Sequence, residues 1–177
     1  MTNIVIMRDT IMEYCGYDTE VLPSNIFLEE SFDDCLYGVS AVCNNYTPAY
    51  HYNRLINKLE ETKNLSPDQA VDYFNENILD KYENVSFICF IEKTLAEFAK
   101  YNPDMLFFDD LNNALVGFKI EKNNEIVAVY DRDLCIDTLT ETMDNDIDSA
   151  YEWFEYNTTQ SYVGNNTPCI LYDLQWI

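Results

Sequence analysis

Two kinds of hydrophobic pattern alternate along the chain. Short runs rich in β-branched and aromatic residues favour strands, and they occupy residues 35–42, 85–91, 114–120, 125–130 and 168–172. Between them, apolar residues recur at the spacing of one helical face. These residues are Leu55, Ile56 and Leu59 in one segment and Ile136, Leu139 and Met143 in another. The pattern predicts a fold that mixes helices and strands.

Two further helices are predicted from their start signals. Ser66 is followed by Pro67 and, three positions on, by Gln69, which together form the sequence of a capping box with proline at the first helical position. Asp146 is the corresponding cap later in the chain. Each start precedes a stripe that we expect to be buried. The stripes are Ala70, Tyr73, Phe74 and Ile78 in the first helix and Ala150, Trp153 and Phe154 in the second.

The sequence also matches itself at a shift of 79 residues, which becomes 80 after one inserted residue. The matched pairs include Leu36 and Leu115, Gly38 and Gly117, Ala49 and Ala128, Ile56 and Ile136, Leu59 and Leu139, Ala70 and Ala150, Phe74 and Phe154, Asn77 and Asn157, Tyr82 and Tyr162, and Cys89 and Cys169. Asparagine pairs at 44–45 and 123–124 also match, and each predicts a turn because asparagine tolerates positive φ. The repetition indicates a duplicated β-β-α-α-β module.

The expected architecture is an α+β fold in which a tandem duplication of this module forms one compact body with pseudo-two-fold symmetry. Residues 1–30 form an N-terminal extension, with a strand at Ile4 to Ile6 and a helix around Asp9 to Tyr14. Residues 31–92 form the first, degenerate module, 93–110 a helical linker, and 111–177 the second module. We expect two three-stranded sheets that pack side by side, or that join edge to edge into one sheet with helices on one face.

The charge is strongly negative and unevenly distributed. The formal net charge is −22, from 32 acidic and 10 basic residues. No lysine or arginine occurs from Asp9 to Asn53 or from Asp133 to Ile177. Such a surface excludes electrostatic binding to nucleic acid or to an anionic membrane. The chain shows neither a signal peptide nor a long apolar segment, so we expect a cytoplasmic protein.

The inventory of reactive residues argues against an enzyme. His51 is the only histidine, so a Ser-His-Asp or Cys-His set would have to include it, and it lies between two tyrosines. The chain has four glycines, which excludes a glycine-rich phosphate loop. The six cysteines lack CxxC spacing and are expected to be buried, reduced thiols. The acids from Asp144 to Asp148 resemble the start of a calcium loop but lack its glycine and final glutamate. We expect no cofactor and no metal.

The second module carries a set of short motifs ahead of its last strand. They are Ala114-Leu-Val-Gly117, Tyr130-Asp131, Trp153-Phe-Glu-Tyr-Asn157, Tyr162-Val-Gly164 and Thr167-Pro168. This segment resembles a group of short phage and prophage accessory proteins that has no assigned activity. The resemblance implies an origin in a mobile element and work directed at the host, such as blocking a defence system. For Asn157 itself we expect a structural role, as a left-handed helix cap or a partner of the following loop.

Together, charge and resemblance favour an inhibitor that is not an enzyme. Rows of carboxylates can imitate the phosphates of a duplex, so a basic host nuclease or Cas effector would bind them in place of nucleic acid. This is an anti-CRISPR or anti-restriction type of function in the host cytoplasm. The candidate partner-binding residues are Asp144, Asp148, Tyr151, Glu152, Glu155 and Tyr156. Tyrosines among these acids would anchor arginine side chains, whereas Trp153 and Phe154 are expected to face the core.

Two other functions remain open from the sequence. The interface between the two copies could hold a metal or a small ligand, because duplicated folds place sites near their symmetry axis. The chain could also be a virion structural or assembly protein.

Overall fold

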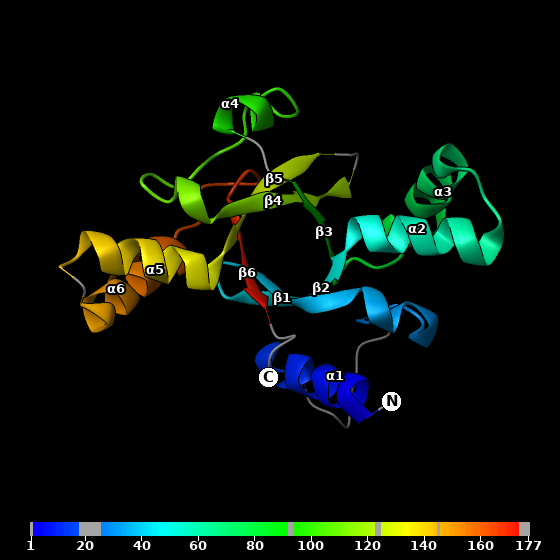
Figure 1. The fold of residues 1–177 in the computed structure, drawn as a ribbon, viewed down its shortest axis with the longest axis horizontal. Helices are drawn as coiled ribbons and strands as arrows, with labels where there is room; N and C mark the ends of the chain where they lie inside the picture. Colours follow the sequence, from blue (N-terminus) through cyan, green and yellow to red (C-terminus); the bar gives the residue numbers. More distant parts are fainter. Residues whose placement is uncertain (1, 18–25, 92–93, 123–124, 145, 174–177) are drawn as a thin grey trace.

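A computed structural model describes residues 2–17, 26–91, 94–122, 125–144 and 146–173, and it shows a closed six-stranded β-barrel with helices around it (Figure 1). The strands follow one another around the barrel in sequence order, and the last pairs with the first. They are β1 (Leu36–Val42), β2 (Asn45–His51), β3 (Ser86–Phe90), β4 (Leu115–Ile120), β5 (Ile126–Asp131) and β6 (Cys169–Asp173).

Strand directions follow from the connections. β1 and β2 form an antiparallel hairpin whose turn residues Cys43 and Asn44 have φ of 49° and 60°, the left-handed conformation that a tight hairpin turn requires. β4 and β5 form the second hairpin, whose predicted turn at 123–124 lies outside the described residues. β2 pairs with β3, and β5 with β6, in parallel, which requires a crossover connection. The pairs β3–β4 and β6–β1 are antiparallel and close the ring.

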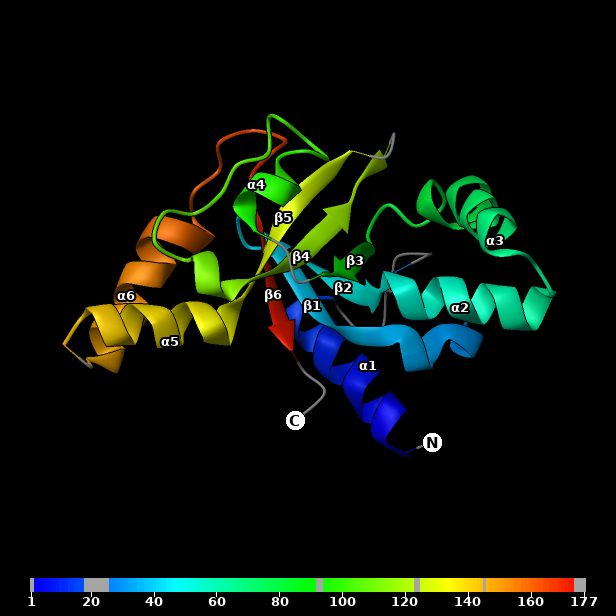
Figure 2. The same cartoon turned by 45° about the horizontal axis from the view of Figure 1, so that its top comes forward.

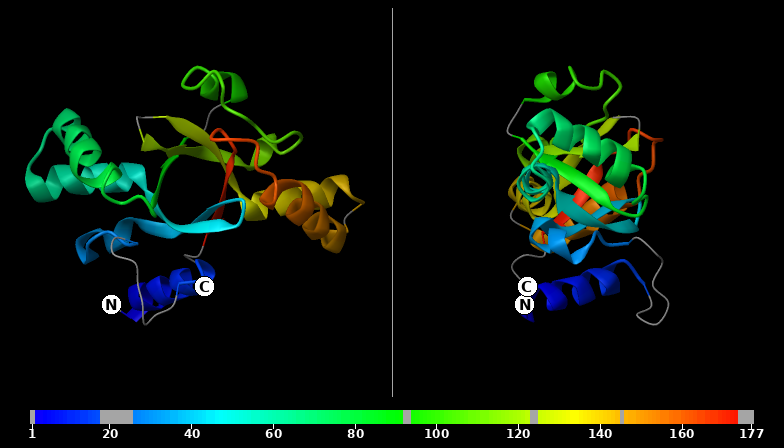
Figure 3. Two further views of the ribbon diagram at one scale, coloured as in Figure 1. Left: turned by 180° about the vertical axis from the view of Figure 1, so that it is seen from behind. Right: turned by 90° about the vertical axis from the view of Figure 1, so that its right-hand side faces the viewer.

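Helices supply both crossovers. The first contains α2 (Tyr52–Lys63), α3 (Pro67–Phe74) and the π-helical turn η2 (Asn75–Leu79), and the second contains α5 (Arg132–Thr142), α6 (Ile147–Phe154) and the π-helical turn η5 (Glu155–Thr159). The two helical pairs lie on opposite sides of the barrel, as the view from behind also shows (Figure 3). The expectation of an open sheet with helices on one face is therefore wrong, because the strands pair at both edges.

The remaining helical elements flank the barrel. They are α1 (Thr2–Tyr14), η1 (Glu30–Cys35), α4 (Leu95–Phe98) and η3 (Asn112–Ala114). The strand expected at Ile4 to Ile6 is wrong, since these residues belong to α1; a short β-branched run fits either a strand or a buried helix turn. The short helix expected between the modules is confirmed as α4. Of the helices in the described ranges, none is long and apolar enough to cross a membrane.

The strand residues separate into two apolar clusters according to which face of the barrel they occupy. One cluster contains strand residues alone, including Ala49, Ile88 and Leu171, and fills the barrel interior. The other joins outward-facing residues such as Phe87 to helix residues such as Leu59 and Phe154. The predicted helical faces of α2 and α5 are confirmed in this second cluster, with Met143 only partly buried. All six cysteines are free, as predicted, but only Cys35, Cys89, Cys135 and Cys169 are buried, whereas Cys15 and Cys43 are partly exposed.

The β-β-α-α-β order occurs twice, and several contacts recur at equivalent positions. The backbone N–H of Leu28 donates to the Tyr50 hydroxyl over 3.1 Å, and that of Phe108 donates to the Tyr130 hydroxyl over 3.1 Å. Both hairpins shift register at the same place, between Leu36 and Gly38 and between Leu115 and Gly117.

The equivalence ends before the last strand of each half. Ala49 pairs with Ser86, whereas Val129 pairs with Cys169. Because Ala49 pairs with Gly38 and Val129 with Gly117, Ala49 corresponds to Val129, and its alignment with Ala128 is wrong. Cys169 therefore occupies the position of Ser86, and its alignment with Cys89 is also wrong. The loop before β6 is longer than the loop before β3, and this difference displaces the register.

Candidate functional site

The six predicted partner-binding residues are all exposed, on α6, on η5 or in the turn before α6. The helix start explains why. The Asp146 carboxylate accepts hydrogen bonds from the backbone N–H groups of Asp148 and Ser149, as the sequence predicts. Ala150 and Phe154 then face the core with no exposed surface, which turns the positions between them outward. Tyr156 is the most exposed of the set, at 77%.

The exposed acids of this region form a surface on the second helical pair. We call it the acidic surface, and it consists of Asp137, Glu141, Asp144, Asp146, Asp148, Glu152 and Glu155. None of these carboxylates lies within salt-bridge distance of a cation among the residues that the structure describes. The nearest cation in sequence, Arg132, pairs with Asp133 over 2.8 Å. Figure 2 shows α5 and α6 side by side on the flank that carries these acids.

The other cation-free stretch of the sequence is different. Asp33 pairs with Arg8 and Asp34 pairs with Lys58, so cations from elsewhere in the chain reach its acids. The acids of the two stretches therefore differ in their partners. In the second stretch Asp133 pairs with Arg132, whereas the acids from Asp137 to Glu155 have no described lysine or arginine within salt-bridge distance.

Two of the predicted residues already have partners within the chain. The Arg132 guanidinium lies 5.2 Å from the ring centroid of Tyr151, so this ring already receives a cation. The Thr159 hydroxyl donates to the Glu155 carboxylate over 3.0 Å. Tyr156 is thus a more accessible aromatic residue than Tyr151.

The prediction that Trp153 faces the core is wrong, since 38% of its surface is exposed. It lines a groove of about 890 Å³ between α5, the α6–η5 segment and the residues that precede β4. We call this the second-half groove, and its walls include Phe107, Met143 and Trp153, with Asp109, Asp110 and Glu141 among its polar residues. Residues 106–110 fall in the predicted helical linker, and their place in the wall of a groove was not predicted. The apolar run Leu106-Phe-Phe108 beside two acids was the available signal.

Asn157 has a structural role, though not the expected one. It lies inside η5, and its side-chain N–H donates to the Trp153 carbonyl over 2.9 Å. It is therefore not a left-handed cap. Asn77 makes the same bond to the Tyr73 carbonyl over 3.0 Å. Each asparagine thus bonds the backbone carbonyl of the aromatic residue one turn earlier. In the second half that aromatic residue is Trp153, which lines the groove.

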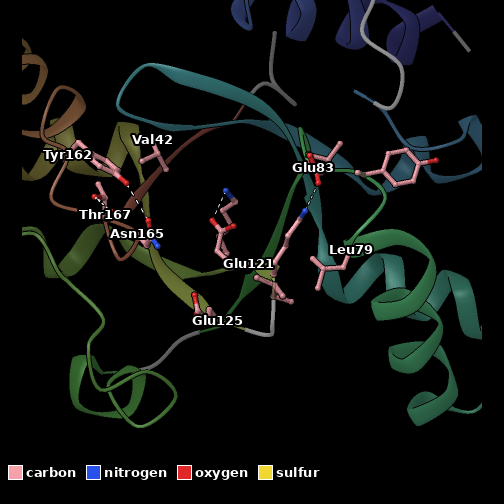
Figure 4. Close-up of a pocket in the computed structure, with 14 residues that line it drawn as sticks. Val42, Leu79, Glu83, Glu121, Glu125, Tyr162, Asn165 and Thr167 are labelled. Carbon is pink, nitrogen blue, oxygen red and sulfur yellow. Dashed lines mark hydrogen bonds and ion pairs between the residues drawn. The ribbon is translucent and has the colours of Figure 1, made fainter.

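A second candidate site is a pocket of about 370 Å³ at one end of the barrel (Figure 4). Both halves contribute to its lining, Val42 and Glu83 from the first and Glu121 and Thr167 from the second. Four of its charged side chains form two ion pairs, because Lys119 lies 2.8 Å from Glu121 and Lys122 bonds Glu83. The lining mixes apolar and charged side chains, so it can offer both apolar contacts and hydrogen bonds to a small ligand.

His51 lies on the last residue of β2 and is half-buried. Its ring stacks on Phe90 with centroids 4.7 Å apart, and its Nδ1 has no hydrogen-bond partner in the described structure. Burial, together with Arg54, lowers the pKa of His51. Nearby on the barrel strands, the Tyr37 hydroxyl donates to the Asp173 carboxylate over 2.9 Å. The surroundings favour a neutral imidazole held by aromatic packing.

A search of the described residues found no group of three or more histidine, cysteine or acidic side chains placed to hold a metal ion. Comparisons with family models, with curated proteins and with solved structures found no match for this chain.

Proposed function

We propose that this protein is not an enzyme, and that it binds a basic nucleic-acid-binding protein of the host through the acidic surface and thereby inhibits it. One observation supports this above others: seven exposed carboxylates share one helical pair, and no described cation neutralises them. Neighbouring acids at helical spacing, such as Asp144 and Asp148, repel one another by a few tenths of a kcal/mol per pair. A cationic partner relieves that repulsion.

The physics of such binding resembles that of nucleic acid. A groove lined with lysine and arginine attracts any dense array of negative charge, so the acidic surface competes with phosphates for it. Electrostatic attraction makes the encounter fast and makes the affinity fall as salt rises. The partner is thus a nuclease or other defence enzyme whose substrate site is basic.

The resemblance to phage accessory proteins supports the same proposal, since it implies an origin in a mobile element and work directed at the host. We also infer that the two halves arose by duplication of one β-β-α-α-β module. The recurring hydroxyl contacts of Tyr50 and Tyr130 and the paired register shifts support this origin.

The test is affinity capture from host lysate, with charge reversal on each half as matched variants. One variant carries Asp144→Lys, Asp148→Lys, Glu152→Lys and Glu155→Lys. The control carries Glu61→Lys, Asp72→Lys, Glu76→Lys and Asp80→Lys, which reverse four exposed acids of the first half. The proposal expects a basic nucleic-acid-binding protein that salt and duplex DNA release, that the control retains and that the first variant loses. Equal retention by both variants, or retention that DNA does not affect, would contradict it.

The pocket at the end of the barrel favours a second function, as a small-ligand site between the halves. Its lining from both halves is the observation behind this alternative. Thermal melting with inorganic phosphate, Mg²⁺ or Ca²⁺ tests it, because specific binding raises the melting temperature by mass action. An unchanged melting temperature with all three probes removes these ligands from consideration.

A further inference from the structure

The second-half groove has an equivalent in the first half. A groove of about 350 Å³ lies between α2, the α3–η2 segment and the residues before β1. Equivalent positions line both grooves. They are Thr62 and Thr142, Lys63 and Met143, Tyr73 and Trp153, Asn77 and Asn157, Ile78 and Thr158, and Lys81 and Ser161. The same local fold therefore builds both grooves, and they differ in the side chains at these equivalent positions.

The first-half groove contains its own cations. The Lys63 ammonium lies 4.6 Å from the ring centroid of Tyr73, and the Lys81 ammonium lies 5.1 Å from that of Tyr82. Both distances are within the range of a cation–π interaction. In the first half, therefore, lysines of the same chain already contact the aromatic side chains that line the groove.

The second-half groove lacks these cations. Met143 stands in place of Lys63 and Ser161 in place of Lys81, and none of the described residues that line the groove is lysine or arginine. The aromatic wall is larger, since Trp153 replaces Tyr73, and tryptophan binds cations best. Asp109, Asp110 and Glu141 add negative charge. The groove also has the larger volume of the two.

We propose that the second-half groove binds a basic amphipathic segment of the partner protein, with an arginine or lysine against Trp153 and apolar residues against Phe107 and Met143. The proposal rests on the proposed function, since it specifies how the basic partner is held. Charge complementarity selects the occupant: the groove combines apolar walls with unpaired acids. Exposed acids alone attract any cation, whereas the groove selects cations that are flanked by apolar side chains.

Trp153 itself reports occupancy. The chain has two tryptophans, so Trp176→Phe leaves Trp153 as the single tryptophan, and excitation at a wavelength that only tryptophan absorbs isolates its emission. The probes are a short amphipathic peptide of leucine, alanine and arginine, the same peptide with glutamine for arginine, and an oligoarginine. We expect the first peptide to change Trp153 emission and to bind about tenfold more tightly than either of the others.

Met143→Lys gives the groove the cation that the first half has at Lys63. We expect it to weaken binding of the arginine–leucine peptide about tenfold more than Asn57→Lys does, which adds the same charge at an exposed site on α2. Ser161→Lys, the equivalent of Lys81, is a second variant with the same expectation. Circular dichroism checks that each variant folds.

The outcomes separate the two proposals. Equal affinity for oligoarginine and the arginine–leucine peptide, with Met143→Lys no different from Asn57→Lys, would overturn the groove proposal and leave the acidic surface as the binding element. Failure of both cationic probes to bind at low salt would count against the proposed function as well. Tight binding of the glutamine peptide would show an apolar groove without charge selection, which also overturns the inference.

Discussion

Single residues set how closely the barrel strands approach one another. Gly117 on β4 is the clearest case, because a Cβ atom built there would lie 2.1 Å from the carbonyl oxygen of Cys89 on β3. That contact is with backbone, which no side-chain rotation can relieve. Only glycine fits where the ring closes between the two halves.

Gly117→Ala is therefore expected to destabilise the protein by about 3 kcal/mol, the upper part of the usual range for overpacking. The added methyl group must push β3 and β4 apart and break their pairing at Cys89 and Phe118. Urea unfolding measures the loss. A free energy of unfolding within error of the unmodified chain would mean that the strands can separate at little cost.

The structural roles of single residues were predictable where the signal in the sequence was local. The caps Ser66 and Asp146 and the exposure of Tyr156 follow from neighbouring residues, and the structure bears them out. The core position predicted for Trp153 is wrong, because positions three and four after Ala150 both fit one helical stripe and only Phe154 is buried. Its exposure depends on the residues before β4, which are distant in sequence.

At the scale of elements, the start of α5 combines a cap with a half-buried carboxylate. The Asp131 carboxylate accepts a hydrogen bond from the backbone N–H of Leu134 over 3.0 Å. Burial raises the pKa of Asp131, and the negative charges of Asp133 and Asp173 raise it further. At α6 the exposed cap Asp146 differs, since hydrogen bonds from Ser149 lower its pKa. The pKa values of these two caps are therefore shifted in opposite directions.

Asp131→Asn and Asp146→Asn are expected to have opposite effects at pH 7. A raised pKa in the folded state means that ionised Asp131 costs stability at neutral pH, so its amide, which can still cap the helix, raises the melting temperature. The gain disappears as pH falls below the unfolded-state pKa of about 3.9. Ionised Asp146 stabilises, so its replacement lowers the melting temperature at pH 7. Melting curves at several pH values measure both, and shifts of the same sign would contradict the assignment.

The elements themselves were largely predictable, and their assembly was not. Strands, helical faces and the short helix α4 follow from periodicity and start signals within a few residues. Closure of the barrel depends on pairing between β3 and β4 and between β6 and β1, which join residues far apart in the chain. The register of Cys169 was also not predictable. It depends on the length of the loop before β6, and loop length produces no periodic pattern in the sequence.

At the scale of the whole molecule, negative charge dominates. A net charge of −22 on 177 residues makes the folded body repel itself, and the acidic surface concentrates part of that repulsion on one flank. The chain has 10 lysine and arginine residues to offset this charge. Three of them pair with acids of the first half: Arg8 with Asp33, Lys58 with Asp34 and Lys122 with Glu83.

Salt is therefore expected to stabilise the isolated protein while it weakens binding to a cationic partner. Raising NaCl from about 10 mM to about 150 mM shortens the Debye length from about 30 Å to about 8 Å and screens the repulsion. The melting temperature should rise over this range, and sucrose at matched osmolarity is the control. A melting temperature that falls with NaCl would mean that ion pairs outweigh repulsion.

The way the ring closes also bears on how such a chain could begin. Each half has two edge strands, β1 and β3 in the first half and β4 and β6 in the second. β3 pairs with β4, and β6 pairs with β1, and both pairings are antiparallel. A lone half-chain would carry edges that match those of its own copy, so two identical short chains could complete a barrel between them. If the two halves arose by the duplication proposed above, an ancestor of half the length would have been an obligate homodimer. Residues 26–91 expressed alone should sediment as a dimer, at twice the mass of the segment. A folded monomer would show that pairing of the edge strands does not hold two such segments together.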